Sequence, residues 1–243
     1  LITKAEENEL SLLHFAESLV DHEITMREDR RIRLNMKRAG FPVVKLLEEF
    51  DFKIQTTVTK RQIISLMDFS FIENRQNLIF IGVPGVGKTH LSISIGFKAV
   101  EAGYRVLFTT AVGLVEMLDL AELKRELKKK ITAISKFDVL IIDECPMVNV
   151  DMWVALLKSL PYYTKVIMVG DVNQLPAISA GKVFDDLLDF NKIPSTKLKS
   201  IHRQEMEGLI VSNSRLINKG MTMIIPTPEL GNDFYFAGSR TTQ

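Results

Sequence analysis

Gly82-Val83-Pro84-Gly85-Val86-Gly87-Lys88-Thr89 matches the pattern G-x-x-x-x-G-K-(S/T) at every specified position. The octapeptide follows the apolar run 77–81, which has the composition of a buried strand, and it opens a helical segment over residues 88–102. A strand, a glycine-rich turn and a helix in this order predict a phosphate-binding loop. The glycines let backbone N–H groups approach phosphate oxygens, and the helix start supplies further unpaired N–H groups.

Two side chains of this loop carry specific chemistry. We expect the ammonium of Lys88 to bridge the β- and γ-phosphates of ATP and the hydroxyl of Thr89 to bind Mg²⁺. The alternative, a glycine-rich turn with an incidental lysine, does not explain why both flanks are also correct. The predicted ATP-binding residues are Gly82, Val83, Pro84, Gly85, Val86, Gly87, Lys88, Thr89 and His90.

A second apolar run ends in two acids. Residues 137–144 have the sequence Phe-Asp-Val-Leu-Ile-Ile-Asp-Glu, and four consecutive apolar residues before the carboxylates indicate a strand that is buried on both faces. The carboxyl end of such a strand lies beside the phosphate loop in a parallel sheet. We therefore expect Asp143 to hold the Mg²⁺ shell and Glu144 to orient or deprotonate the water that attacks the γ-phosphorus.

A third predicted strand, residues 165–169, leads into Gly170-Asp171-Val172-Asn173-Gln174-Leu175-Pro176. A polar side chain just past this strand would face the nucleotide beside Glu144. Gln174 is the candidate, because its amide can hydrogen-bond the γ-phosphate or the attacking water. The alternative is a polar turn closed by Pro176.

The remaining pattern predicts a P-loop NTPase, a three-layer α/β/α fold with a mainly parallel five-stranded sheet, preceded by an α-helical N-terminal region. Further strands are expected at 105–110 and 197–201, and a short one at 233–236. Helices are expected at 1–39, 41–52, 113–130, 152–160, 183–190 and 206–219, with another after a capping box at Thr59-Lys60-Arg61-Gln62. We divide the chain into a helical N-terminal region (1–68), an ATPase core (69–204) and a C-terminal helix with a short strand (205–243).

Composition narrows the class of protein. The 243 residues are 46% hydrophobic, which allows a sizeable core. The net charge of +1 gives no indication of a nucleic-acid partner. The single cysteine excludes an internal disulfide framework and fits a reducing cytoplasm, and no apolar run has membrane-spanning length. The four histidines lack metal-ligand spacing, and Trp153 is expected to be a packing residue.

The N-terminal region contains a dense basic segment. Six basic residues lie within twelve positions, against Glu28 and Asp29 only. They can form a surface for DNA phosphates or an acidic partner, or simply a solvated helix face, and the charge pattern alone does not decide between these. The six are Arg27, Arg30, Arg31, Arg33, Lys37 and Arg38.

Residues from about 10 to 144 resemble the IstB-type helper ATPases of insertion-sequence transposition, which are relatives of the DnaC helicase loaders. The resemblance is carried by Ala39-Gly40-Phe41-Pro42, by residues 45–52 and 77–90, by Ala99-Val100-Glu101-Ala102-Gly103-Tyr104-Arg105-Val106, and by residues 138–144. It implies an AAA+ domain behind helices, assembly on DNA and action with a transposase. After Glu144 the chain departs from that family, since its Gly-Tyr-Leu-Pro segment, Thr-Ser-Asn sensor and late arginine-bearing helix are not found.

Residues 143–236 instead resemble the first motor domain of RecD-like superfamily 1 DNA helicases. The matching segments are Asp143-Glu144-Cys145-Pro146-Met147-Val148, residues 169–176, Ile201-His202-Arg203-Gln204 and residues 232–236. This resemblance implies that Arg203 approaches the γ-phosphate, although an aromatic residue is usual in that family where His202 stands. The chain then looks like a chimera that is joined at Asp143-Glu144.

Three functions follow as hypotheses. The first is a DNA-associated ATPase of the transposition-helper type, which binds Mg-ATP. It would act with a transposase or another DNA-processing protein, and it could form ATP-dependent homo-oligomers. The second is a helicase motor fragment that does not unwind DNA on its own. The third is an assembly switch that hydrolyses ATP poorly because Arg203 is misplaced. The expected catalytic residues are Glu144, Lys88, Gln174 and Arg203, and the expected metal ligands are Thr89 and Asp143.

Overall fold

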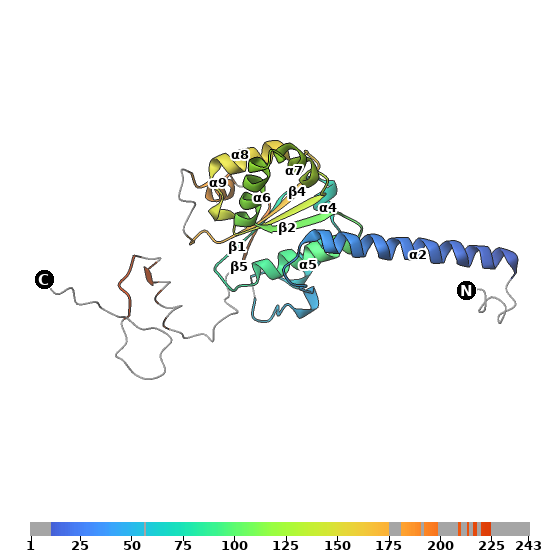
Figure 1. Ribbon diagram of the computed structural model, residues 1–243. Helices are drawn as coiled ribbons and strands as arrows, with labels where there is room; N and C mark the ends of the chain where they lie inside the picture. The colour runs from blue at the N-terminus through green and yellow to red at the C-terminus, as the bar shows by residue number, and fades with distance from the viewer. Residues whose placement is uncertain are drawn as a thin grey trace, which may run out of the picture.

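Five parallel strands form one sheet at the centre of the molecule (Figure 1). The computed structural model describes residues 11–55, 57–174, 181–190, 192–198, 209, 213, 216–217 and 220–224. The strand order is β2-β3-β4-β1-β5, and every neighbouring pair is parallel. The predicted parallel sheet is confirmed. The strands are β1 (Leu78–Gly82), β2 (Val106–Thr110), β3 (Val139–Asp143), β4 (Lys165–Gly170) and β5 (Ser195–Leu198).

Alternate side chains of the strands pack into two hydrophobic cores, one on each face of the sheet. Phe80, Ile141 and Ile167 belong to the core under α5 (Lys88–Glu101) and the C-terminal end of α2 (Leu12–Ala39). Ile79 and Leu140 belong to the other core, which includes the fully buried Trp153. Both faces are therefore apolar, as buried parallel strands require. The second core is covered by α6 (Ala111–Leu123), α7 (Leu127–Ile134), α8 (Val150–Ser159) and α9 (Val183–Asp189).

Along the chain, three short helices connect α2 to β1. They are η1 (Leu47–Glu49), α3 (Lys60–Leu66) and α4 (Ser70–Glu73). The predicted capping box is confirmed, since the Thr59 hydroxyl accepts from the Gln62 N–H and the Gln62 side chain accepts from the Thr59 N–H. The helix expected over residues 41–52 was wrong. Only the single turn η1 is helical there. α2 ends at Gly40 (φ 69°), and Pro42 disfavours the helical conformation at Phe41, so the helix does not continue.

The expected continuous helix over residues 113–130 was also wrong. α6 already begins at Ala111, where the Thr110 hydroxyl caps it by accepting from the Gly113 N–H. It ends at Leu123, and Arg125 adopts a left-handed conformation (φ 58°) before α7 begins at Leu127. The turn lets α7 fold back toward the sheet and bury Ile134. The apolar spacing is helical on both sides of the turn, so no signal in the sequence marks this break.

Several predictions lie outside the described residues: the helix over residues 1–10, Arg203, most of the helix at 206–219 and the strand at 233–236. A short helix η2 (Cys145–Met147) follows β3 directly. None of the helices in the described ranges combines the length and apolar character that crossing a bilayer requires.

Candidate functional site

The phosphate loop joins β1 to α5 at the carboxyl edge of the sheet, and its shape depends on glycine. Gly85 and Gly87 have φ values of 83° and 93°, which side chains on L-residues rarely tolerate. A Cβ at Gly87 would lie 2.5 Å from Cε2 of Phe50. α5 begins without a side-chain cap, so its first N–H groups are available to an anion.

Lys88 is nearly buried at the start of α5, with 9% of its surface exposed. Its ammonium donates to the carbonyl oxygen of Val83 at 2.9 Å, which folds the side chain back across the loop. Burial lowers the pKa of Lys88, and the carboxylates of Asp171 and Asp143 act in the opposite direction. A cation beside the uncapped start of α5 suits an anionic ligand.

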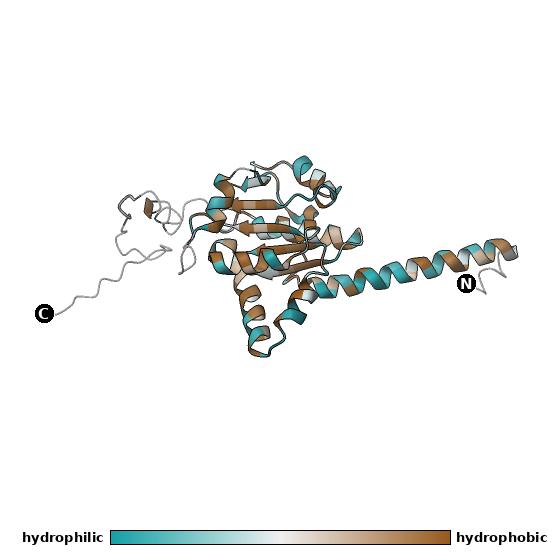
Figure 2. Cartoon of the chain, turned by 90° about the horizontal axis from the view of Figure 1, so that it is seen from above, coloured by the Kyte–Doolittle hydropathy of each residue, from teal (hydrophilic) through white to brown (hydrophobic). Residues whose placement is uncertain are grey.

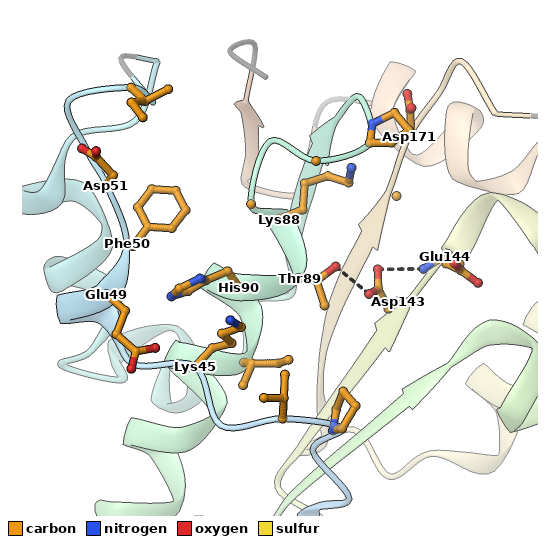
Figure 3. Close-up of a pocket in the computed structure, with 18 of the residues that line it drawn as sticks. Lys45, Glu49, Phe50, Asp51, Lys88, Thr89, His90, Asp143, Glu144 and Asp171 are labelled. Atoms are coloured by element: carbon orange, nitrogen blue, oxygen red, sulfur yellow. Dashed lines mark hydrogen bonds between the residues drawn. The ribbon is translucent and has the colours of Figure 1, made fainter. Parts of the chain in front are cut away.

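Thr89 and Asp143 meet although 54 positions separate them in the chain. The Thr89 hydroxyl donates to Oδ2 of Asp143 at 2.7 Å, and Oδ1 of Asp143 accepts from the backbone N–H of Glu144 at 3.0 Å (Figure 3). A hydroxyl and a carboxylate are the hard oxygen ligands that Mg²⁺ uses together with phosphate oxygens and water. No group of three or more His, Cys, Asp or Glu side chains in the described ranges is arranged to hold a metal ion.

Glu144 lies at the mouth of the site. It is exposed, and its backbone is left-handed (φ 61°), an unusual conformation for a residue other than glycine. Its side chain points away from Asp143 in Figure 3. Unusual backbone angles of this kind occur at functional sites, where surrounding structure enforces them.

The loop that follows β4 contributes two further polar groups to the same cavity, Asp171 and Gln174. Asp171 is 2% exposed, and its Oδ1 accepts from the backbone N–H of Asn173 at 3.0 Å. Sequence reasoning placed Gln174 here but gave Asp171 no role. The available signal was its position directly after a buried strand, like that of Asp143. Arg203 lies outside the described residues.

The far wall of the cavity comes from the segment between α2 and α3, which sequence reasoning did not connect with the site. Nε2 of His90 donates to the carbonyl oxygen of Leu46 at 2.8 Å, and the Ser94 hydroxyl donates to the carbonyl oxygen of Lys45 at 2.9 Å. The rings of Phe50 and His90 pack edge to face, with centroids 5.3 Å apart (Figure 3). These contacts hold an irregular segment over the phosphate loop.

Together these elements enclose a cavity of about 730 Å³, a size typical of small-molecule sites. The phosphate loop and Asp143 line it, and so do Pro42, Val43 and Ile54 from the segment that forms the far wall. The six basic residues of α2 do not line it. Arg31 instead lies against Gly103, where its guanidinium would be 3.1 Å from an added Cβ.

A parallel sheet in the order β2-β3-β4-β1-β5, with a phosphate loop after β1 and acids after β3, defines an ATP-binding P-loop protein of the AAA+ type. The profile of the family described as "IstB-like ATP binding protein" matches residues 1–157. The chain belongs to this family.

Comparisons with individual proteins agree. A putative ATP-binding protein of insertion sequence IS5376 from Geobacillus stearothermophilus is 39% identical over 147 residues, which cover 60% of this chain and 59% of that protein. AMPPCP-bound DnaA from Aquifex aeolicus shares the fold at 16% identity and a TM-score of 0.54, over 73% of this chain and 56% of that one. Pif1 helicase from Candida albicans shares it at 21% identity and a TM-score of 0.50, over 68% and 44% of the two chains. The chain spans little more than half the length of the first curated relatives it matches.

Proposed function

We propose that this protein hydrolyses ATP with Mg²⁺ and uses the nucleotide state to act with DNA, as a helper ATPase of insertion-sequence transposition. The observation that carries the proposal is the direct hydrogen bond between Thr89 and Asp143, 2.7 Å long, beside Lys88. It places a hydroxyl, a carboxylate and a cation at the start of one helix, as a Mg-nucleotide requires. Mg²⁺, when bound, neutralises charge on the β- and γ-phosphates.

The residues around this centre take distinct roles in the proposal. Lys88 leaves the carbonyl of Val83 and binds phosphate oxygens. Glu144 orients the attacking water or accepts its proton, and its exposed position at the mouth leaves room for that water. Gln174 hydrogen-bonds the γ-phosphate or the water from β4. We also assign Arg203 the stabilisation of charge that develops during hydrolysis.

The far wall of the cavity suits the nucleoside. Pro42, Val43 and Ile54 provide apolar surface, and Lys45, Glu49 and Asp51 provide polar groups around it. We propose that this segment holds the base and ribose, and that residues 1–68 therefore serve the ATP site as well as external partners. The core then comprises residues 69–204, with 205–243 as a C-terminal appendage.

The proposed DNA and transposase partners rest on family membership. The curated relative is named as an insertion-sequence protein. The exposed basic residues of α2 offer a surface for DNA phosphates, whose affinity would fall steeply with salt.

A second candidate is a helicase-derived motor segment over residues 143–236. Two observations support it. The family profile ends at residue 157, inside α8, and Gln174, which the helicase resemblance assigns to the nucleotide site, lines the cavity. On this hypothesis the change of ancestry falls between Asp143 and α8. If the join misplaces Arg203, the protein would bind ATP as an assembly switch and hydrolyse it poorly.

One experiment separates these functions. ATP hydrolysis is measured alone, with duplex DNA and with single-stranded DNA, and the oligomer size is measured in parallel. The helper function predicts ATP-dependent oligomers on duplex DNA and faster hydrolysis there. A monomer stimulated by single strands would instead support the helicase segment, and binding without turnover would support the switch.

The catalytic assignment has its own test. Glu144→Gln should lower hydrolysis by about 10²-fold or more while leaving ATP binding intact, because the amide can still contact water but cannot accept its proton. Hydrolysis that survives this substitution would refute the role of Glu144.

A further inference from the structure

Asp171 is a buried carboxylate that the proposed mechanism does not use. It directly follows β4, a strand of the hydrophobic sheet that is coloured mainly brown in Figure 2. It is 2% exposed and lines the same cavity as the phosphate loop. Burying an ionised carboxylate costs free energy unless neighbouring groups compensate for it. No ion pair in the described part of the chain includes Asp171, so the compensation comes from hydrogen bonds and from charge that is farther away.

Asp171 closes the turn that follows β4 through two hydrogen bonds. Its Oδ1 accepts from the backbone N–H of Asn173 at 3.0 Å, which makes an Asx turn. Its backbone carbonyl oxygen accepts from the backbone N–H of Gln174 at 3.1 Å, the bond that closes a β-turn. Val172 and Asn173 at the tip of the turn are exposed, whereas Gln174 is half-buried and lines the cavity. The two bonds therefore fix the backbone of Gln174 relative to the end of β4.

The end of β4 is itself held beside the phosphate loop. Gly170 pairs with Ile81 of β1, which lies one residue before the loop begins. A Cβ at Gly170 would lie 2.6 Å from Cδ of Pro146 and 2.8 Å from the Phe184 ring, so η2 and α9 pack tightly against this point. The residue after Gly170 consequently has little freedom to move relative to the phosphate loop.

We propose that Asp171 is the positioning residue for Gln174, because its side chain holds the turn that presents the Gln174 amide to the nucleotide. This inference rests on the proposed function, which gives Gln174 the contact with the γ-phosphate or the attacking water. Asp171 acts through Gln174 and is assigned no contact of its own with the reacting atoms. Such positioning matters because a misplacement of about 1 Å can lower a rate by about 10²-fold.

The negative charge of Asp171 has a separate effect, on Lys88. The side chain of Lys88 extends toward Asp171 in Figure 3. Burial lowers the pKa of Lys88, and of the two carboxylates that oppose this effect Asp171 acts more strongly than Asp143. Asparagine in place of Asp171 would keep an acceptor for the Asx turn and lose the charge, whereas alanine would lose both. Substitution can therefore separate the turn from the charge.

The test is steady-state hydrolysis of Mg-ATP by variants of the full chain. Gln174→Ala and Asp171→Ala should each lower kcat by about tenfold or more, because both remove the correctly placed amide. Asp171→Asn should recover most of that loss, since its Oδ1 can accept the same hydrogen bond from Asn173. The double variant Asp171→Ala/Gln174→Ala should be no slower than Gln174→Ala, because the group that Asp171 positions is already absent.

A matched control lies in the same turn. Asn173→Ala changes an exposed side chain but keeps the backbone N–H that donates to Asp171, so its kcat should equal that of the original chain. A purely structural role of Asp171 predicts another pattern, in which the losses of Asp171→Ala and Gln174→Ala multiply in the double variant. Chemical unfolding of each variant gives the folded fraction, by which each kcat is corrected.

The same variants distinguish two kinds of failure. If Gln174→Ala hydrolyses ATP like the original chain, the role that the proposed function gives to Gln174 is wrong, and Asp171 cannot act through it. If Gln174→Ala is slower but Asp171→Ala is not, or if the two losses multiply, only the positioning role of Asp171 is wrong.

A second readout applies if the chain binds ATP without turnover. The ratio of the dissociation constants for ADP and ATP, measured by calorimetry, reports the contact with the γ-phosphate, which ADP lacks. This ratio should fall in Gln174→Ala and Asp171→Ala and should be largely restored in Asp171→Asn. The same ratio in all variants of a chain without turnover overturns the proposal.

Discussion

Gly87 meets two requirements that no other residue meets together, a left-handed backbone (φ 93°) and close approach of Phe50. Gly87→Ala should weaken ATP binding and lower the free energy of unfolding by about 1–3 kcal/mol, because it adds backbone strain and a clash at 2.5 Å. Isothermal titration with ATP and chemical unfolding measure the two effects.

The control for this prediction separates the clash from the strain. Adding Phe50→Leu to Gly87→Ala removes the aromatic ring but leaves the unfavourable φ angle, so it should recover only part of the stability. Gly87→Ala with unchanged ATP binding would contradict the described loop.

On the proposed function, Lys88 would exchange one partner for another when ATP binds. Its ammonium donates to the carbonyl oxygen of Val83 at 2.9 Å, and burial lowers its pKa. Lys88→Met keeps much of the length and apolar stem, so it should leave the fold intact while abolishing detectable ATP binding. Thermal unfolding with and without Mg-ATP checks this: the original chain should gain stability from the nucleotide and the variant should gain none.

At the scale of elements, β2 and β3 are joined at their amino ends by an ion pair. Arg105 contacts Asp138 through Nη2 at 2.7 Å and Nε at 3.1 Å, and its backbone N–H also donates to the carboxylate at 2.8 Å. Burial alone would raise the pKa of Asp138, but these hydrogen bonds and the charge of Arg105 hold it below its ordinary value.

The sign of the pH effect follows from that lowered pKa. The pair stabilises the folded state above the ordinary pKa of aspartate, and the contribution is lost as the pH falls through the lower folded pKa. Asp138→Asn should cost about 1 kcal/mol at pH 7, since Arg105 is largely exposed and screened. The difference between the two proteins should shrink below pH ~4 in urea unfolding. Glu101→Gln, which removes the exposed partner of Lys98, should cost less at every pH.

Some elements of the site could be predicted from the sequence and others could not. The phosphate loop and the acids after β3 could be placed because each is a continuous motif whose position in a parallel sheet is fixed by topology. The segment around Leu46 and Phe50 could not, since its conformation depends on contacts with His90 and Ser94 more than forty residues away. The break at Arg125 was missed because apolar spacing continued through it.

At the scale of the whole molecule, packing is incomplete between α6, α7 and α8. An apolar groove of about 160 Å³ lies there, lined by Leu114, Leu118, Ile131, Val148 and Met152. The indole N–H of Trp153 on α8 is buried, and it finds no hydrogen-bond partner in the described part of the chain. The groove and the unpaired indole indicate that this layer is packed less tightly than the centre of the sheet.

A matched pair of substitutions tests that argument. Val148→Ile adds one methylene beside the groove and should raise the free energy of unfolding by up to about 0.8 kcal/mol, the value of one buried methylene. Val139→Ile adds the same group to the centre of β3, where Val139 is 0% exposed, and should lower it by about 1–3 kcal/mol through overpacking. Urea unfolding measures both. If Val148→Ile destabilises the protein as much as Val139→Ile does, the groove is as well packed as the sheet, and the argument for loose packing in this layer fails.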